Sequence, residues 1–237
     1  MKPQVFKTIA TAFLLAVAVV LNAQPVEKKF EKTFNVDCNT KLIVSHQFGE
    51  LKIVPHSSQT IEVVAVAKVE ARKAKNSEKM LENINVKMEQ SGNEVKIKTI
   101  LDGIDNSKEL EINMEIRLPE CIESSLKNRF GNLIIPDYKG KLFIDLEFGT
   151  LAAGKLMNEE NQIELGYAES SKITELSTSK LKLRFSKLTV TEAAKTDLNS
   201  QYSTLEIAAA PAIEGKSQFD KITINEAAFV KLDCQYT

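Results

Sequence analysis

The sequence predicts an all-β protein, a single-stranded β-solenoid of β-helix-like stacked coils that follows a strand-rich N-terminal part containing one short helix. An aromatic residue returns every 17 to 19 positions through the C-terminal half, a small or polar residue usually follows it, and an aliphatic residue stands three positions later in most copies. A constant period is typical of folds in which each repeat buries its apolar face against its neighbours. The aromatic residues of this series are Phe130, Phe148, Tyr167, Phe185, Tyr202, Phe219 and Tyr236, with an outlying first member at Phe48.

Residues 1–23 have the pattern of a cleaved secretory signal peptide. Lys2 and Lys7 give a positive start, residues 9–21 are almost purely apolar, and Ala23 offers a small residue at the cleavage site. A single membrane anchor is the competing interpretation, but this apolar run is shorter than the ~20 residues that a spanning helix needs. We therefore expect an exported chain in the periplasm, at the outer surface or secreted, with no transmembrane anchor after cleavage.

Residues 24–120 form the predicted strand-rich part, because apolar and polar residues alternate there with period two. Residues 74–83 break this pattern: they contain no β-branched residue and many helix formers, which predicts a short helix near residues 75–83. The predicted strands are Lys32–Val36, Lys41–His46, Leu51–Pro55, Thr60–Val69, Ile84–Glu89, Glu94–Ile100 and Leu110–Leu118.

Residues 121–237 contain the solenoid repeats, with two short strands and a third corner expected in each turn. A sandwich would not require the constant period, and a leucine-rich repeat would show a helical phase that these units lack. Because Leu181, Leu183 and Phe185 alternate, we expect the aromatic rings to face inward and stack in the core. The small residue after each ring then marks a tight corner. The chain stops at Thr237 within the repeated phrase, so we also expect the repeats to be truncated at the C-terminus.

The cysteines are the next feature. Cys38 lies ten residues before Phe48, and Cys121 lies nine residues before Phe130, so the two occupy nearly equivalent places in two repeats. One hypothesis is a Cys38–Cys121 disulfide, and the alternative is two separate small apolar side chains. Cys234 replaces an inward leucine of other copies, which predicts a buried thiol.

Neither charge nor motifs indicate a catalytic, metal or nucleic-acid site. The formal net charge is -1 with both signs mixed along the chain, so the basic footprint of a nucleic-acid partner is missing. His46 and His56 have no accompanying ligands at metal-binding spacing. The column just before the rings holds one carboxylate, Glu147, and several glutamines, which favours an amide ladder over a hydrolytic site. We therefore expect no enzyme, metal or cofactor.

Two segments of the sequence resemble a known family. HQFGELKIVPHSSQTIEVVAVAKVEA and ELEINMEIRLPECIESSLKNRFGNLIIPDYKGKLFIDLEFGTL resemble the opening and the first coils of the bacterial putative-adhesin family of unknown function, whose members are similar to the heads of autotransporter adhesins. The resemblance covers nearly all of the chain after the signal peptide, and its motifs are structural. It implies an exported β-solenoid at a Gram-negative envelope, and it transfers no catalytic or binding residue.

Together these observations predict a non-enzymatic exported envelope or cell-surface protein. It would act as an adhesin or scaffold that presents a flat rigid face to a surface or envelope partner, a glycan or a protein. The alternative is a glycan-binding or polysaccharide-processing module, which outward clusters of acids and aromatic residues would favour.

Overall fold

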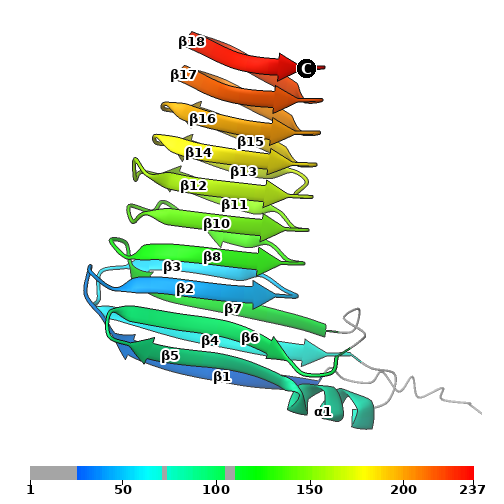
Figure 1. Ribbon diagram of the computed structural model, residues 1–237. Helices are drawn as coiled ribbons and strands as arrows, with labels where there is room; N and C mark the ends of the chain where they lie inside the picture. Colours follow the sequence, from blue (N-terminus) through cyan, green and yellow to red (C-terminus); the bar gives the residue numbers. More distant parts are fainter. Residues whose placement is uncertain (1–25, 71–73, 105–109) are drawn as a thin grey trace, which may run out of the picture.

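The computed structural model describes residues 26–70, 74–104 and 110–237, and the predicted signal peptide of residues 1–23 lies outside them. The described chain is a β-solenoid whose coils stack along one axis, as Figure 1 shows. Each coil contributes one strand to each of two faces, and the strands of a face pair from coil to coil. The predicted fold class, an all-β solenoid with one short helix among the described residues, is confirmed.

The first face consists of the strands that lead into the aromatic residues, with two further strands at its base. Its pairing is antiparallel between β5 and β6 and parallel from β6 onward. In spatial order the strands are β5 (Ile84–Ser91), β6 (Glu94–Leu101), β2 (Lys41–Gln47), β8 (Glu123–Arg129), β10 (Leu142–Glu147), β12 (Asn161–Gly166), β14 (Ser179–Arg184), β16 (Thr196–Gln201) and the second halves of β17 (Thr204–Gln218) and β18 (Lys221–Gln235).

The second face consists of the strands that follow the aromatic residues, with further strands at its base. It begins with two antiparallel pairings and continues in parallel from β7 onward. In spatial order the strands are β1 (Val26–Asn35), β4 (Thr60–Val69), β7 (Leu110–Pro119), β3 (Leu51–His56), β9 (Leu133–Ile135), β11 (Leu151–Leu156), β13 (Ser171–Leu176), β15 (Lys187–Ala193) and the first halves of β17 and β18.

The base of the solenoid holds the helix. The predicted helix near residues 75–83 is α1 (Ala74–Glu82), which lies beside β1 and β4 at the bottom of Figure 1. Lys28 Nζ donates to the carbonyl oxygens of Leu81 at 3.2 Å and Ile84 at 2.9 Å, so the end of the helix is attached to β1. The antiparallel strands and the helix together close this end of the stack, where a bare coil would expose unpaired backbone groups.

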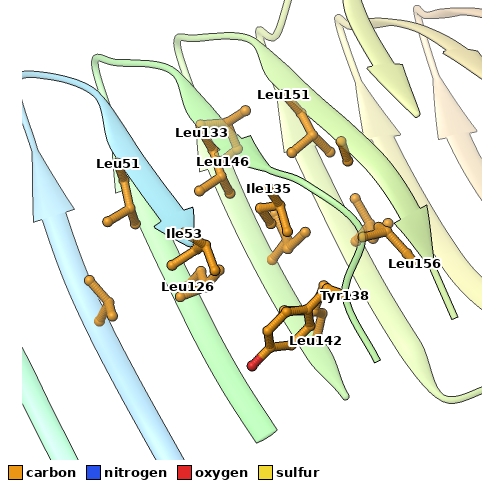
Figure 2. Close-up of a cluster of buried hydrophobic side chains, with 14 of the residues drawn as sticks. Leu51, Ile53, Leu126, Leu133, Ile135, Tyr138, Leu142, Leu146, Leu151 and Leu156 are labelled. Atoms are coloured by element: carbon orange, nitrogen blue, oxygen red, sulfur yellow. The ribbon is translucent and has the colours of Figure 1, made fainter. Parts of the chain in front are cut away.

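The core consists of aliphatic columns that run along the axis. Leu51, Leu133 and Leu151 occupy the same place in three successive coils and are almost fully buried (Figure 2). Ser171 continues this column, and its Oγ accepts a hydrogen bond from Leu151 N at 3.0 Å, which satisfies the buried hydroxyl. One hydrophobic cluster extends from Phe34 to Ile213, so the N-terminal strands and the coils share a single core.

The strands differ from the sequence prediction at two places. β17 and β18 each run through 15 residues, where two short strands and a further corner were expected. β17 nevertheless passes from one face to the other within its length, since its first half pairs with β15 and its second half pairs with β16. β1 also begins six residues before the predicted Lys32. In residues 26–70, 74–104 and 110–237, no helix has the length and apolar character to cross a membrane.

Candidate functional site

A continuous stack of aromatic rings follows the corner where the first face ends and the second begins. Neighbouring rings have centroids 4.8–5.1 Å apart and planes within 10° of parallel. In Figure 1 this corner lies at the edge of the stack where the arrowheads of β2, β8, β10, β12, β14 and β16 end. We call this stack the aromatic ladder, and its rungs are Phe48, Phe130, Phe148, Tyr167, Phe185, Tyr202, Phe219 and Tyr236.

The ladder lies on the surface, so the prediction that the rings face inward was wrong. The six rungs from Phe130 to Phe219 are 46–51% exposed. Each aromatic residue has a positive φ, between 48° and 62°, which interrupts the strand alternation at the ring itself. The side chain that would follow Leu146 inward therefore turns outward at Phe148, and the chain resumes an inward position at Leu151. The left-handed residue of the corner is therefore the aromatic one and not the small residue that follows it.

The small residues after the rings are required by the close approach of successive coils. A Cβ added to Gly131 would lie 1.8 Å from Gly49 O, and one added to Gly149 would lie 2.0 Å from Gly131 O. Only glycine fits these two corners. In later coils a side chain fills the place and bonds to the coil before it: Ser186 N donates to Ser203 Oγ at 3.1 Å, and Ser203 N donates to Asp220 Oδ1 at 2.7 Å.

The column just before the rings is polar, and its members bond to one another. In the lower coils Glu147 lies 2.9 Å from Arg129 Nε and 4.0 Å from Arg184 Nη2. Gly166 stands between Glu147 and Arg184 in the parallel register and has no side chain to separate them.

In the upper coils the same column is an amide ladder, as the sequence predicted. Gln201 donates to Gln218 at 2.8 Å, and Gln218 donates to Gln235 at 3.0 Å. The charges and amides beside the rings are therefore largely matched within the protein.

The spacing of the rings decides which part of them a partner can touch. At centroid separations near 5 Å, both faces of every inner ring are covered by its neighbours. A sugar ring that stacks on an aromatic side chain needs a free face, whereas the ladder presents ring edges. Edges carry the positive part of the aromatic quadrupole and pack well against other apolar groups and ring faces.

Hollows lie at both corners of the solenoid. One of about 500 Å³ lies beside the first rungs, where Glu50, Asn113 and Asn132 join Phe48 and Phe130 in its lining. Asn113 is already engaged, since its Oδ1 accepts from Glu50 N and its Nδ2 donates to Glu111.

The second hollow, of about 330 Å³, lies at the corner opposite the ladder. Its lining includes Lys141 and Glu160, which form an ion pair with each other, and Lys195, whose Nζ lies 3.5 Å from Glu214. Much of the charge around it is therefore paired within the protein.

The two histidines occupy different environments. His46 is buried, and its Nε2 donates to Ile112 O at 2.9 Å while its Nδ1 accepts from Thr99 Oγ1 at 2.9 Å. Burial lowers the pKa of His46 from 6.5 to about 4, against the smaller opposing effect of the hydrogen bond to Ile112. His56 lies in a turn, where its Nδ1 accepts from Ser58 N. Within the described residues, no group of three or more His, Cys, Asp or Glu side chains is placed to hold a metal ion.

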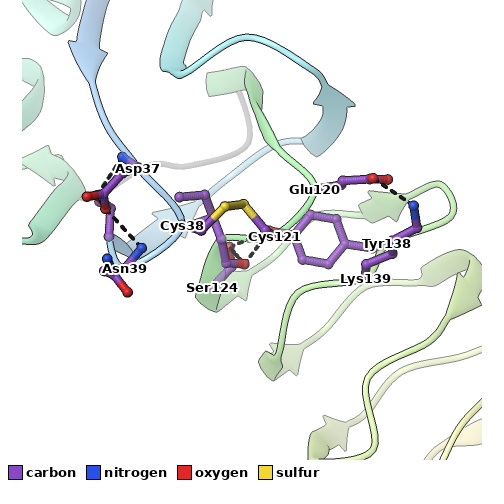
Figure 3. Close-up of a disulfide and its surroundings, with 10 residues drawn as sticks. Asp37, Cys38, Asn39, Glu120, Cys121, Ser124, Tyr138 and Lys139 are labelled. Carbon is purple, nitrogen blue, oxygen red and sulfur yellow. Dashed lines mark hydrogen bonds and ion pairs between the residues drawn. A yellow bond between two sulfur atoms is a disulfide. The ribbon is translucent and has the colours of Figure 1, made fainter.

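The structure joins Cys38 and Cys121 in a disulfide between neighbouring coils, with 5.4 Å between their Cα atoms (Figure 3). Tyr138 lies beside it and is fully buried, with its hydroxyl donating to Ile122 O at 2.6 Å and lying 3.1 Å from Ser124 Oγ. Burial raises the pKa of Tyr138 well above its ordinary value, so the phenol remains a donor. Cys234 is an exposed free thiol, contrary to the predicted buried one. Cys234 pairs with the buried Ser217 in the parallel register, so it continues an inward column. It is exposed because no described strand covers the outer side of β18.

The comparisons with known proteins find similar proteins among solved structures. No protein-family model matches the sequence, and no curated protein matches it either. A putative adhesin from Bacteroides fragilis NCTC 9343 is similar in structure, with 11% identity, a TM-score of 0.46, and coverage of 88% of this chain and 95% of that one. A putative cell adhesion protein from Clostridium sporogenes ATCC 15579 has 13% identity and a TM-score of 0.31, with 87% and 100% covered. A putative lipid binding protein from Parabacteroides distasonis ATCC 8503 has 9% identity and a TM-score of 0.33, with 86% and 94% covered.

Proposed function

We propose that the protein is a non-enzymatic exported scaffold or adhesin of the bacterial envelope or cell surface. Its solenoid holds the aromatic ladder as a straight, rigid contact edge. The observation that carries this proposal is the exposure of a continuous stack of rings along one corner of the fold.

The ladder is a preorganised surface. Each rung is set by parallel pairing of the strand before it and the strand after it, as for Phe148 between β10 and β11. The coil spacing of ~4.8 Å places eight rungs along about 34 Å. A partner that binds along this edge meets apolar groups that lose little conformational freedom, which lowers the cost of binding.

Stability alone does not explain why the rungs are aromatic. A bulky residue with positive φ carries a backbone cost of about 1–2 kcal/mol. A stacked ring pair contributes about 0.5–1.5 kcal/mol beyond the burial of area, so the two effects nearly cancel. Glycine or asparagine would form the corner with less strain. The repeated choice of an exposed ring therefore supports a role in contact with a partner.

Export is supported by the disulfide. Cys38 and Cys121 are bonded in the structure, and disulfides persist mainly in the oxidising compartments outside the cytoplasm. This agrees with the signal peptide predicted for residues 1–23. The covered ring faces favour a protein partner over a glycan for the ladder itself.

Cell-surface display tests the proposal. Non-adherent bacteria that display the wild-type chain should adhere to protein-coated wells or to one another, and the double variant Phe148→Asn with Phe185→Asn should lose this adhesion. Asparagine tolerates positive φ, so the corners are retained. The matched control is Lys172→Ala, an exposed change on the second face away from the ladder. Binding to a glycan array, or cleavage of polysaccharide, that persists in the double variant would contradict the proposal and favour the glycan-directed alternative.

A further inference from the structure

We infer that the aromatic ladder binds a second copy of the same chain, in antiparallel orientation, about a twofold axis that passes between Tyr167 and Phe185. This inference rests on the proposed function, because it names the partner of the contact edge. It follows from the area of the ladder and from the charges on its two sides.

The apolar area is that of a protein interface. An aromatic side chain presents 150–250 Å² when fully exposed, so eight rungs that are about half exposed offer roughly 600–900 Å². The largest apolar patch on a typical monomer is about 300–600 Å². A stable interface buries about 800 Å² on each partner. The ladder therefore matches one side of a standard interface and exceeds an ordinary surface patch.

Antiparallel pairing about this axis sets each rung of one copy against a rung of the second copy that lies equally far beyond the axis. Tyr167 meets Phe185 of the second copy, and Phe148 meets Tyr202. In the column just before the rings, Arg184 then faces Gly166 of the second copy, and Glu147 faces Gln201. Arg129 faces Gln218 in the same way. No like charges meet in this column, and each charged group faces a neutral residue that can accommodate it.

Two exposed charges just after the rings supply attraction, in corners of unequal length: the corner after Tyr167 is one residue longer than the corner after Phe185, because Ser171 pairs with Leu188. Glu169 follows Tyr167 and Lys187 follows Phe185, and both side chains are exposed. The antiparallel arrangement places Glu169 opposite Lys187 of the second copy, and symmetry repeats the contact. Lys187 Nζ lies 3.3 Å from Glu206, so it would join an acidic group from each chain. Complementary charges at an interface fix its orientation and register.

Other arrangements bring like charges together. A parallel pair places the column before the rings of one copy against the column after the rings of the other, so Arg184 faces Lys187. An antiparallel pair shifted by one rung places Glu169 opposite Glu169, or, with the opposite shift, Lys187 opposite Lys187. Like charges across an interface oppose association. An antiparallel pair centred between Phe185 and Tyr202 avoids like charges too and places Glu169 opposite Lys221, but it leaves Phe48 and Phe130 of each copy without a partner ring. The charge pattern and the full overlap of the ladders together select the antiparallel pair centred between Tyr167 and Phe185.

A charge-swap cycle measured by sedimentation equilibrium tests the arrangement on the mature chain. The wild type should be a dimer. Glu169→Lys alone, and Lys187→Glu alone, should each weaken the dimer about tenfold, because two attractive contacts become repulsive. The double variant Glu169→Lys with Lys187→Glu should recover most of the affinity. Glu169→Lys should unfold at the wild-type temperature, because Glu169 is exposed. Lys187→Glu loses the ion pair with Glu206 and should melt slightly lower while remaining folded.

A ring variant provides the second measurement. Tyr167→Asn with Phe185→Asn should be monomeric while its circular dichroism remains that of a β protein. A wild-type chain that stays monomeric at about 100 μM overturns the inference, since interfaces of this area bind in the micromolar range or tighter. A dimer that is unaffected by either single charge reversal also overturns it.

The proposed function is tested separately with Glu169→Lys, which retains every ring. Adhesion of this variant to protein-coated wells at the wild-type level, together with a monomeric wild type, would retain the contact role and reject self-association.

Discussion

The ring of Tyr202 stacks on the ring of Phe219, with 4.8 Å between the two centroids and 1° between the two planes. Both residues have positive φ, 52° and 55° respectively. The same residue therefore carries a favourable side-chain contact and an unfavourable backbone conformation. These two contributions can be separated by substitution, because some side chains remove the ring and others also relieve the backbone.

Phe185→Ala and Phe185→Asn should differ in stability. Both remove stacking on Tyr167 and Tyr202, which should lower the free energy of unfolding by about 1–3 kcal/mol. Asparagine is tolerated at positive φ and alanine is not, so the asparagine variant should recover part of that loss. Urea unfolding of the three proteins measures the difference. Equal stability of the two variants would show that the corner is not strained.

Gly131→Ala and Gly166→Ala form a matched pair at the same corner region. The new Cβ at residue 131 would lie 1.8 Å from Gly49 O, a backbone atom that can move only if the coils separate. The variant should lose at least about 3 kcal/mol or fail to fold. At residue 166 the nearest heavy atom is Glu147 Cγ at 3.5 Å, an ordinary contact, so the change should cost less than about 1 kcal/mol. Similar melting temperatures for both variants would contradict the tight corner.

The coils could be predicted from the sequence because their period is fixed by stacking. Leu51, Leu133 and Leu151 recur at the same place relative to the aromatic residue, and a buried column requires this recurrence. The alternation of strands likewise placed the aliphatic residues correctly.

The direction of the rings was predicted wrongly, because alternation holds only for extended backbone. One signal was available: Leu146, Phe148 and Leu151 cannot all be inward in one uninterrupted strand, since the last spacing is three. The alternation must break between residues 148 and 151, and Gly149, as the small residue after the ring, is the position that residue type favours. The structure places it at Phe148, whose φ is 57°. Aromatic residues are uncommon at positive φ, so residue type favoured the wrong position.

Glu169 and Lys187 were also not identified from the sequence. Each is a single charged residue on a solvated corner. Its proposed role in binding depends on the exposure of the ring before it. Once the ladder is known to lie outside, the charges two residues after each ring become the border of a contact surface.

The Cys38–Cys121 disulfide should make a large contribution to stability. It closes a sequence separation of 83 residues, so its loss should lower the free energy of unfolding by about 2–5 kcal/mol. The double variant Cys38→Ser with Cys121→Ser measures this by urea unfolding. Cys234→Ser is the control, since that thiol is free and exposed and its replacement should change stability by less than about 0.5 kcal/mol. A reductant that leaves the wild-type unfolding midpoint unchanged would argue against the bond.

His46 should make stability depend on pH between about 6.5 and 4. In the folded protein burial holds its pKa at about 4, whereas the unfolded chain has the ordinary value of 6.5. The unfolded state therefore binds more protons in this interval, and the free energy of unfolding falls as the pH falls. The stabilisation is fully present above pH 6.5 and amounts to about 3 kcal/mol over the 2.5-unit shift.

The measurement is urea unfolding at several pH values for the wild type and His46→Gln. The variant loses the hydrogen bonds to Thr99 and Ile112 in part, so it should be less stable at pH 7. Its stability should nevertheless fall less steeply from pH 6.5 to 4, because glutamine does not titrate. Carboxylates that titrate in the same interval contribute equally to both proteins and cancel in the difference. Parallel curves for the two proteins would mean that His46 is protonated in the folded state as readily as in the unfolded one, and would rule out the buried neutral imidazole.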